Sequence, residues 1–243
     1  MPLPEGWIVP DWPAPASVRA LVTTRAGGVS EGPYASMNLG QNSGDRPSSV
    51  ARNRAILAGH LPAEPRWLRQ VHGAGVVEAG RDTDDPADAA VARAPGVACA
   101  VLTADCLPVF LCDASGASVG IAHAGWRGLA AGVLERTVER MATGGARLMA
   151  WLGPAIGPQA FEVGAEVRAA FLAHDPGADA AFVDKGGGKY LADLYALARQ
   201  RLAASGVTQV SGGAFCTWSE SGRFLSYRRE KMSGRMASVI WLE

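Results

Sequence analysis

The chain has 243 residues, of which 48% are hydrophobic, so it can bury a substantial core as one large domain or two small ones. Lys plus Arg and Asp plus Glu number 23 each, which gives no electrostatic reason to expect binding to nucleic acid or to an anionic membrane. No apolar run approaches the roughly 20 residues of a membrane span. The four cysteines do not form a disulfide framework in a chain of this length, so we expect a cytoplasmic protein.

The N-terminal part of the sequence predicts short elements separated by polar, glycine-rich segments. Residues 17–24 alternate as a strand does, and residues 48–61 have the apolar spacing of a short helix. Residues 65–80 predict a pair of strands interrupted at glycines. Residues 81–95 are acidic and rich in alanine, which indicates a solvated excursion.

The centre of the sequence is more regular. Three apolar segments predict strands at 97–105, 106–113 and 118–124, and Pro108 places the second of these at a sheet edge or at a strand start. From Leu129 onward the apolar residues recur with helical spacing until a pair of glycines ends the pattern.

The C-terminal part predicts two more helices among strands. In chain order we expect a strand at 147–157, helices at 161–174 and 190–206, a strand at 207–215 and a closing hairpin at 223–243. The sequence contains neither an internal repeat nor a clear linker. We therefore predict one α+β domain over residues 1–243, with the N-terminal and central strands in a common sheet system.

Three residues stand out as candidates for a metal site. His72, Cys106 and His123 lie in segments flanked by Gly, Ala or an acid, where little side-chain bulk obstructs a ligand. Two imidazoles and one thiolate are the donor set of a catalytic zinc site with an open fourth position. Cys106 follows His72 by 34 residues, whereas a zinc finger pairs its ligands two to five residues apart.

Other interpretations of these residues stay open from residue type alone. A histidine such as His123 is often buried against a backbone carbonyl, and a free cysteine is often a small buried apolar residue, as we expect for Cys99 and Cys112. Cys106 with His123 as its base is also the pattern of a cysteine hydrolase. The glycine-punctuated turn after His123 and its Arg127 favour an anion at a helix N-terminus.

A series of segments in fixed order resembles one known family. They are TTRAGGVS, MNLG, NR, QVHGAGVV, TADCLPVFL, AHAGWRGLAAGVLERTV, LGPAIGPQAFEVG, CTW and SYRREKMSGRMASVIWL. They resemble the proteins once called multicopper polyphenol oxidoreductases, or laccase-domain proteins, and now regarded as purine nucleoside phosphorylases. The resemblance runs from Val22 to Leu242. It implies a mixed β-sandwich-like sheet core flanked by helices.

The resemblance also implies an activity and a metal. It implies zinc binding by His72, Cys106 and His123, and phosphorolysis of adenosine, inosine, guanosine and methylthioadenosine to base plus ribose-1-phosphate. Deamination of adenosine to inosine is implied as well. Many relatives carry a cysteine where this chain has Ala155, so a further thiol near the site is missing here. The missing thiol weakens the case for a multinuclear copper site. Copper-dependent oxidation of polyphenols stays an alternative to the zinc-dependent activity.

Catalytic and substrate-binding roles follow as hypotheses. Asp105, Cys106 and His123 are the catalytic candidates, and Asp105 would orient a zinc-bound histidine or carry a proton. For phosphate we expect Arg25, Arg127 or Arg228, and for the nucleoside Asn38 or Gln70. The expected partners are purine nucleosides and phosphate, with no nucleic acid or membrane, and the expected state is a monomer or small homo-oligomer.

Overall fold

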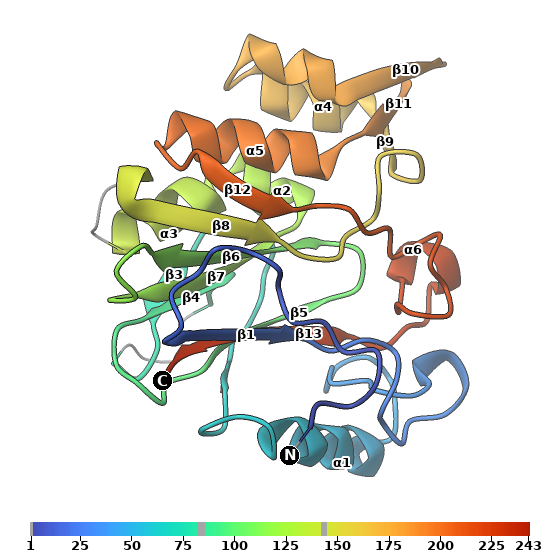
Figure 1. Ribbon diagram of the computed structural model, residues 1–243. Coiled ribbons are helices and arrows are strands. Elements are labelled where there is room, and N and C mark those ends of the chain that lie inside the picture. The colour runs from blue at the N-terminus through green and yellow to red at the C-terminus, as the bar shows by residue number, and fades with distance from the viewer. Residues whose placement is uncertain (1, 82–85, 142–144) are drawn as a thin grey trace.

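The structure is a computed structural model that describes residues 2–81, 86–141 and 145–243. Two mixed sheets pack face to face, and helices cover their outer sides (Figure 1). The first sheet has the order β1–β13–β5–β2, formed by Val18–Val22, Met236–Leu242, Cys99–Thr103 and Arg66–Trp67. The second has the order β12–β8–β6–β7–β4–β3, formed by Gln209–Gly212, Leu148–Leu152, Leu107–Asp113, Val119–Ala124, Ala89–Ala92 and Val76–Glu78.

The remaining elements are a small sheet and the helices. The small sheet has the order β10–β11–β9, formed by Phe182–Gly186, Lys189–Ala192 and Glu162–Gly164. The α-helices are α1 (Pro47–Ala58), α2 (Trp126–Ala130), α3 (Val133–Met141), α4 (Ala165–Leu172), α5 (Leu194–Ala204) and α6 (Tyr227–Glu230). The 3-10 helices are η1 (Gly32–Tyr34), η2 (Gly145–Arg147) and η3 (Pro176–Ala181). None of the helices in the described part has the length and apolar character that a membrane span requires.

Strand β6 shows why the central segments are apolar throughout. Successive side chains of a strand point to opposite faces of its sheet. Phe110 and Cys112 lie in the core between the two sheets, whereas Val109 and Leu111 lie in the core beneath α3 and α5. Both faces of β6 are therefore covered, and all seven of its residues are buried.

The helices cover the two outer faces. In Figure 1, α1 lies below the first sheet, and Leu57 of this helix packs with Leu21 and Val239 of β1 and β13. The apolar stripe of α3, which includes Val133 and Val138, packs on the outer face of the second sheet. The predicted α+β class, with a sandwich-like core flanked by helices, is confirmed. The predicted extent of the domain, residues 1–243, stays a prediction.

Segment 81–95 is the main error among the predicted elements. Instead of a solvated excursion it contains β4, which lies between β7 and β3 with all four residues buried. Its short side chains fit a strand that contacts α3 on one side and β5 on the other. Residues 82–85, which belong to the same predicted excursion, lie outside the described residues.

The predicted strand pair in 65–80 is also corrected. Strand β2 pairs with β5 in the first sheet, whereas β3 pairs with β4 in the second, so the two strands are not partners. The segment between them, which contains His72, therefore carries the chain from one sheet to the other. Pro108 lies near the start of β6, as expected, but β6 is an inner strand between β8 and β7.

Four further predictions change in the C-terminal half. The helix predicted from Leu129 is divided into α2 and α3 at Gly132, whose φ of 89° is left-handed. The helices predicted at 161–174 and 190–206 each begin with a strand, β9 and β11 respectively. The closing hairpin at 223–243 does not form, because its first half contains α6 and β13 pairs instead with β1 and β5.

Candidate metal centre

His72, Cys106 and His123 meet at one place in the fold. His123 lies near the end of β7, Cys106 lies in the turn between β5 and β6, and His72 lies in the crossing segment between β2 and β3. One ligand atom from each lies within 4.8 Å of the others, and this is the one group of at least three His, Cys, Asp or Glu ligands found among the described residues.

The spacing of the donors fits a tetrahedral zinc ion. The Cys106 Sγ and His72 Nε2 atoms are 3.9 Å apart. A sulfur and a nitrogen bound to one zinc at ~2.3 and ~2.1 Å lie about 3.6 Å apart. The rings of His72 and His123 meet edge to face, with 4.7 Å between their centroids. The three donor atoms, all within 4.8 Å of one another, are therefore close enough for one metal ion after side-chain adjustment.

The buried carboxylate of Asp88 holds both histidines. It accepts the backbone N–H groups of Val71, His72 and Gly73 at 3.1, 2.9 and 2.7 Å, which stabilises the left-handed backbone of His72. The same carboxylate bonds His123 Nδ1 at 2.7 Å. His123 therefore presents Nε2 to a metal, in the carboxylate–histidine–metal arrangement common in zinc proteins.

These contacts set the protonation of the Asp88–His123 pair. Burial opposes the ionised form of Asp88, but its hydrogen bonds, chiefly with His123, outweigh burial and lower the pKa of the carboxyl below its ordinary value. Burial alone would lower the pKa of His123. The Cys106 thiolate and Asp88 reverse that effect and raise the pKa of His123 to about 9.

The thiols of the chain divide sharply in acidity. Burial raises the pKa of Cys99 and of Cys112 to about 12, and both lie within apolar strands, as predicted. Burial acts the same way on Cys106, but His123 and His72 outweigh it and lower the pKa of the Cys106 thiol to about 6. Without metal, Cys106 is therefore a thiolate near neutral pH, the form in which cysteine binds zinc.

Two glycines after His123 make room for the centre. A Cβ atom at Gly125 would lie 2.9 Å from Cys106 Sγ and 3.2 Å from His72 Cδ2. A Cβ atom at Gly128 would lie 2.6 Å from the carbonyl oxygen of Gly73. The glycines in this turn thus allow three chain segments to approach closely, and the anion-binding role expected of the turn stays a prediction.

Asp105 occupies a different position from the one expected. Its backbone is left-handed, with a φ of 97°, and the residue is buried, with 8% of its surface exposed. The carboxylate accepts the hydroxyl of Thr217 at 2.6 Å and the backbone N–H of Arg228 at 2.7 Å. The carboxylate that orients a histidine is that of Asp88. Asp105, which directly precedes Cys106, instead connects this turn to the start of α6 by a hydrogen bond.

A groove of about 680 Å³ opens over the three donors, a volume within the range of small-molecule sites. It is lined by Gly40, Gln41, Asn42, Ser43, Arg54, Trp67, Leu68, Arg69, Gln70, His72, Leu102, Thr103, Ala104, Cys106, His123, Tyr227 and Arg235. The groove thus runs from the metal-site candidates to the loop before α1 and to α6. Among the residues predicted to bind substrate, Gln70 is the one that lines this groove.

The other predicted substrate residues have structural partners. Gln70 itself uses its amide to clamp the backbone of Leu102, with bonds of 2.8 and 2.7 Å. Asn38 is fully buried, and its side-chain oxygen accepts the backbone N–H groups of Gly40 and Arg235. Asn38 thus holds the backbone at Gly40 and Arg235 in place but does not itself line the groove.

The three arginines expected to bind phosphate lie outside the groove lining. Arg25 pairs with Glu230 at 2.6 Å, and exposed Arg127 stacks over the ring of Trp126 at 4.5 Å. Arg228 donates to a backbone carbonyl at 2.8 Å.

Asp88 was not predicted from the sequence, and neither were four of the groove residues, Arg54, Trp67, Tyr227 and Arg235. For Asp88 one signal was present: an uninterrupted apolar run, Ala89 to Ala92, follows it directly, as at the start of a buried strand.

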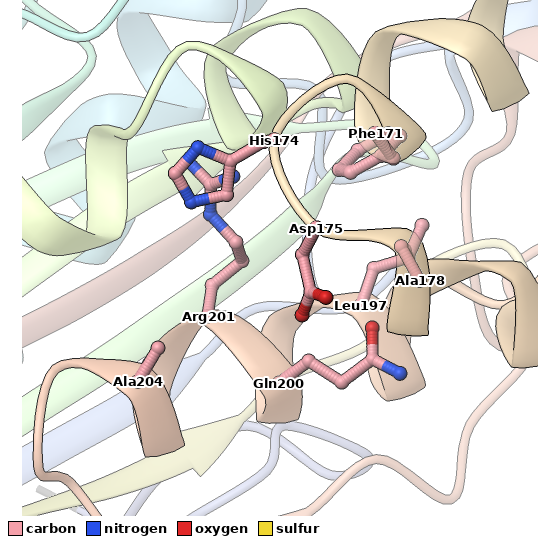
Figure 2. A pocket seen from close by; sticks show the side chains of 8 residues that line it. All are labelled: Phe171, His174, Asp175, Ala178, Leu197, Gln200, Arg201 and Ala204. Atoms are coloured by element: carbon pink, nitrogen blue, oxygen red, sulfur yellow. The ribbon is translucent and has the colours of Figure 1, made fainter.

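A second, smaller hollow shares no lining residue with the groove. It lies between α4, η3 and α5, where Figure 2 shows His174, Asp175 and Arg201 among its walls. Its volume of about 20 Å³ suffices for about one water molecule. His174 is exposed and follows the end of α4. The hollow is too small for a substrate.

Two mixed sheets packed face to face, with a His–Cys–His donor group in the lining of a groove, define an α+β protein with a candidate metal centre. The chain belongs to the family described as multi-copper polyphenol oxidoreductase laccase, whose model matches residues 19–243. The family resemblance seen in the sequence motifs is thereby confirmed.

Relatives and solved structures agree along nearly the whole chain. A purine nucleoside phosphorylase of Pseudomonas aeruginosa is 56% identical over 240 residues, covering 98% of this chain and 99% of that protein. The purine nucleoside phosphorylase YfiH of Escherichia coli is 56% identical over 242 residues, covering 97% and 98%. A Neisseria meningitidis protein of solved structure has a TM-score of 0.95 at 51% identity, covering 98% and 100%. YlmD from Geobacillus stearothermophilus has a TM-score of 0.91 at 32% identity, covering 100% and 98%. The relatives' names support an enzyme.

Proposed function

We propose that this chain is a zinc-dependent purine nucleoside phosphorylase that acts on adenosine, inosine, guanosine and methylthioadenosine and that also deaminates adenosine. The observation that carries the proposal is the convergence of His72, Cys106 and His123 in the lining of a groove large enough for a nucleoside. Relatives named purine nucleoside phosphorylase, 56% identical over nearly the full chain, support the same activity.

Different residues of the chain would have different roles in phosphorolysis. Phosphorolysis forms a bond between a phosphate oxygen and C1′ of the ribose and breaks the bond from C1′ to the purine, whose nitrogen keeps the electron pair and takes up a proton. His72, Cys106 and His123 would hold a zinc ion, which would supply Lewis-acid chemistry when bound. Asp88 keeps His123 in the tautomer and orientation that leave Nε2 free. The groove walls position the nucleoside and shield it from water.

Copper-dependent oxidation of polyphenols is the competing metal-based function. The family's description favours it, and the same His–Cys–His group is able to bind copper. We place it second because the described residues contain one such group, with three ligands. A multicopper oxidase needs several copper ions and correspondingly more soft or imidazole donors.

A cysteine hydrolase is the second competitor, and one observation favours it specifically. Asp88 bonds His123, and His123 in turn acts on the thiol of Cys106, which is the arrangement of an activated cysteine nucleophile. Such an enzyme would work without metal. The three hypotheses therefore differ in what metal removal does.

Metal analysis together with an activity assay tests the proposal. We expect about one zinc per chain, with hypoxanthine released from inosine only when phosphate is present. A chelator abolishes this activity and zinc restores it. Cys106→Ala should fold, lose zinc and lose activity. Activity that returns only with copper and acts on phenols supports the oxidase, and full phosphorylase activity of Cys106→Ala contradicts the proposal.

Alkylation of the metal-free protein tests the thiol directly. The pKa of Cys106 in the folded protein is about 6, below the ordinary 9.0, so its alkylation rate should rise with a midpoint near pH 6. Zinc should suppress the reaction. Metal-independent turnover that iodoacetamide abolishes at Cys106 would favour the hydrolase. A midpoint near 9 would contradict the electrostatic account of the site.

The location and assembly of the protein remain part of the proposal. We place it in the cytoplasm because Cys99, Cys106, Cys112 and Cys216 are all free thiols, as a reducing compartment favours. We propose a monomer or small homo-oligomer, for which light scattering of the purified protein is the test.

A further inference from the structure

The groove is cationic even though the chain as a whole is neutral. Its lining includes Arg54, Arg69 and Arg235, and none of the lining residues in the described part of the chain is acidic. The formal net charge of the chain is zero, so this excess is local. Glu64 also acts on Arg54, but it is exposed, lies outside the lining and accepts the indole N–H of Trp67 at 2.7 Å. A groove lined in this way attracts an anion.

Two of these arginines are fixed through the same peptide segment. Arg54 donates from Nε to the carbonyl oxygen of Leu39 at 3.0 Å, and the N–H of Leu39 donates to the carbonyl oxygen of Arg235 at 2.9 Å. Arg235 also donates from Nη1 to the carbonyl oxygens of Ser233 and Gly234 at 2.7 and 3.0 Å. Both side chains are therefore ordered before any ligand arrives, which reduces the entropic cost of binding.

Each of the two guanidinium groups also stacks on an aromatic side chain of the groove. The Cζ atom of Arg54 lies 4.1 Å from the ring centroid of Trp67, and that of Arg235 lies 5.6 Å from the ring centroid of Tyr227. Stacking occupies a face of each guanidinium, so an oxyanion would bind at its edge, through N–H groups other than Arg54 Nε and Arg235 Nη1, which donate to backbone carbonyls. Gly40 accommodates Arg235, because a Cβ atom there would lie 2.7 Å from Arg235 Cγ.

We propose that Arg54 and Arg235 form an oxyanion subsite of the groove that binds a phosphoryl group. The proposal rests on the proposed phosphorylase function, in which the ligand is inorganic phosphate. The same chemistry would accept the 5′-phosphate of a nucleotide, so the test must separate these two sources. This assignment replaces Arg25, Arg127 and Arg228, which have other partners or lie outside the lining.

The test measures phosphate binding with and without turnover. Zinc-loaded wild type, Arg54→Gln and Arg235→Gln are titrated with inorganic phosphate by calorimetry, and the KM for phosphate is measured with inosine. We expect each variant to weaken phosphate binding and raise this KM about 10- to 100-fold. The KM for inosine and the zinc content should stay within about twofold of wild type.

Matched variants keep the test decisive. Arg52→Gln removes the same charge from an exposed position on α1, outside the groove lining, and should leave phosphate binding unchanged. Gly40→Ala keeps every charge but displaces Arg235, so it should also raise the KM for phosphate. It serves as the independent variant if a Gln variant fails to fold.

Two outcomes overturn the assignment. The first is wild-type binding of both inorganic phosphate and inosine 5′-monophosphate in Arg54→Gln and in Arg235→Gln, and the second is a loss confined to Arg69→Gln. Titration with inosine 5′-monophosphate separates the two sources: if these two variants lose nucleotide binding and keep inorganic phosphate binding, the subsite holds a 5′-phosphate. If wild type binds phosphate through Arg54 and Arg235 but does not cleave inosine, the subsite stands and the proposed phosphorylase function fails.

Discussion

Two buried carboxylates flank the candidate metal centre, and they do different things. Asp88 is far from Cys106 in the sequence, yet it bonds His123 and holds the backbone of His72. Asp105 is the direct neighbour of Cys106, yet it bonds Thr217 and the start of α6. Sequence adjacency to a ligand is therefore a poor guide to which acid acts on the ligands. The number and kind of donors around each carboxylate distinguish the two roles.

The largest expected effect comes from Asp88→Asn. Four donors converge on this carboxylate, three of them backbone N–H groups, so the amide N–H₂ of asparagine must oppose at least one of them. We expect zinc affinity to fall about 10- to 100-fold. The free energy of unfolding of the metal-free protein should fall by about 2–4 kcal/mol. Zinc competition titrations and denaturant unfolding measure the two effects.

A surface acid provides the control for that variant. Asp179 is exposed and pairs with Arg168, so Asp179→Asn should change stability by no more than about 0.5 kcal/mol. Wild-type zinc affinity in Asp88→Asn would contradict the role assigned to this carboxylate. The two carboxylates flanking the centre would then be equivalent in their effect on the metal.

Gly125→Ala should have an intermediate effect, because it crowds the centre without removing a ligand. The new Cβ would approach Cys106 Sγ to 2.9 Å, so either the thiol or the chain has to move. Overpacking of this kind costs about 1–3 kcal/mol of stability, and zinc affinity should fall with it. Gly222→Ala is the matched control, since its Cβ would enter open space. Equal zinc affinity in the two variants would show that the ligands do not depend on this close approach.

The candidate metal ligands were easier to predict from the sequence than the residues that hold those ligands in position. Donor chemistry and glycine-rich context were enough to select His72, Cys106 and His123, because those properties belong to the residues themselves. The role of Asp88 depends on a left-handed turn at His72 lying beside β4, a relation between segments that local sequence does not contain. The same reason explains why β4 was taken for a solvated segment.

Long-range pairing limited the prediction of the fold in the same way. The strand at residues 17–24 was predicted correctly from its alternation, but its partner β13 lies at the other end of the chain. The closing hairpin was predicted because neighbouring strands often pair, and here α6 takes the place of one arm. Arg54 was not singled out because helical periodicity says nothing about which exposed side chain faces a groove built by other segments.

The smallest expected effect comes from making the same substitution at the other carboxylate, Asp105→Asn. Asparagine tolerates the left-handed backbone found at Asp105. Its amide oxygen can accept the N–H of Arg228, while the hydroxyl of Thr217 turns to accept the amide N–H₂. We expect kcat and KM within about twofold of wild type, because the bonds to both partners survive.

Asp105→Ala separates a positioning role from a catalytic one. Alanine removes both acceptors, which releases the start of α6 and with it Tyr227 at the groove wall, so KM for the nucleoside should rise while zinc content is unchanged. A residue that carries a proton in the reaction would behave differently, since Asp105→Asn would then lower kcat about 10²- to 10⁴-fold. Steady-state kinetics of the Asn and Ala variants therefore distinguish a carboxylate that shapes the groove from one that takes part in the chemistry.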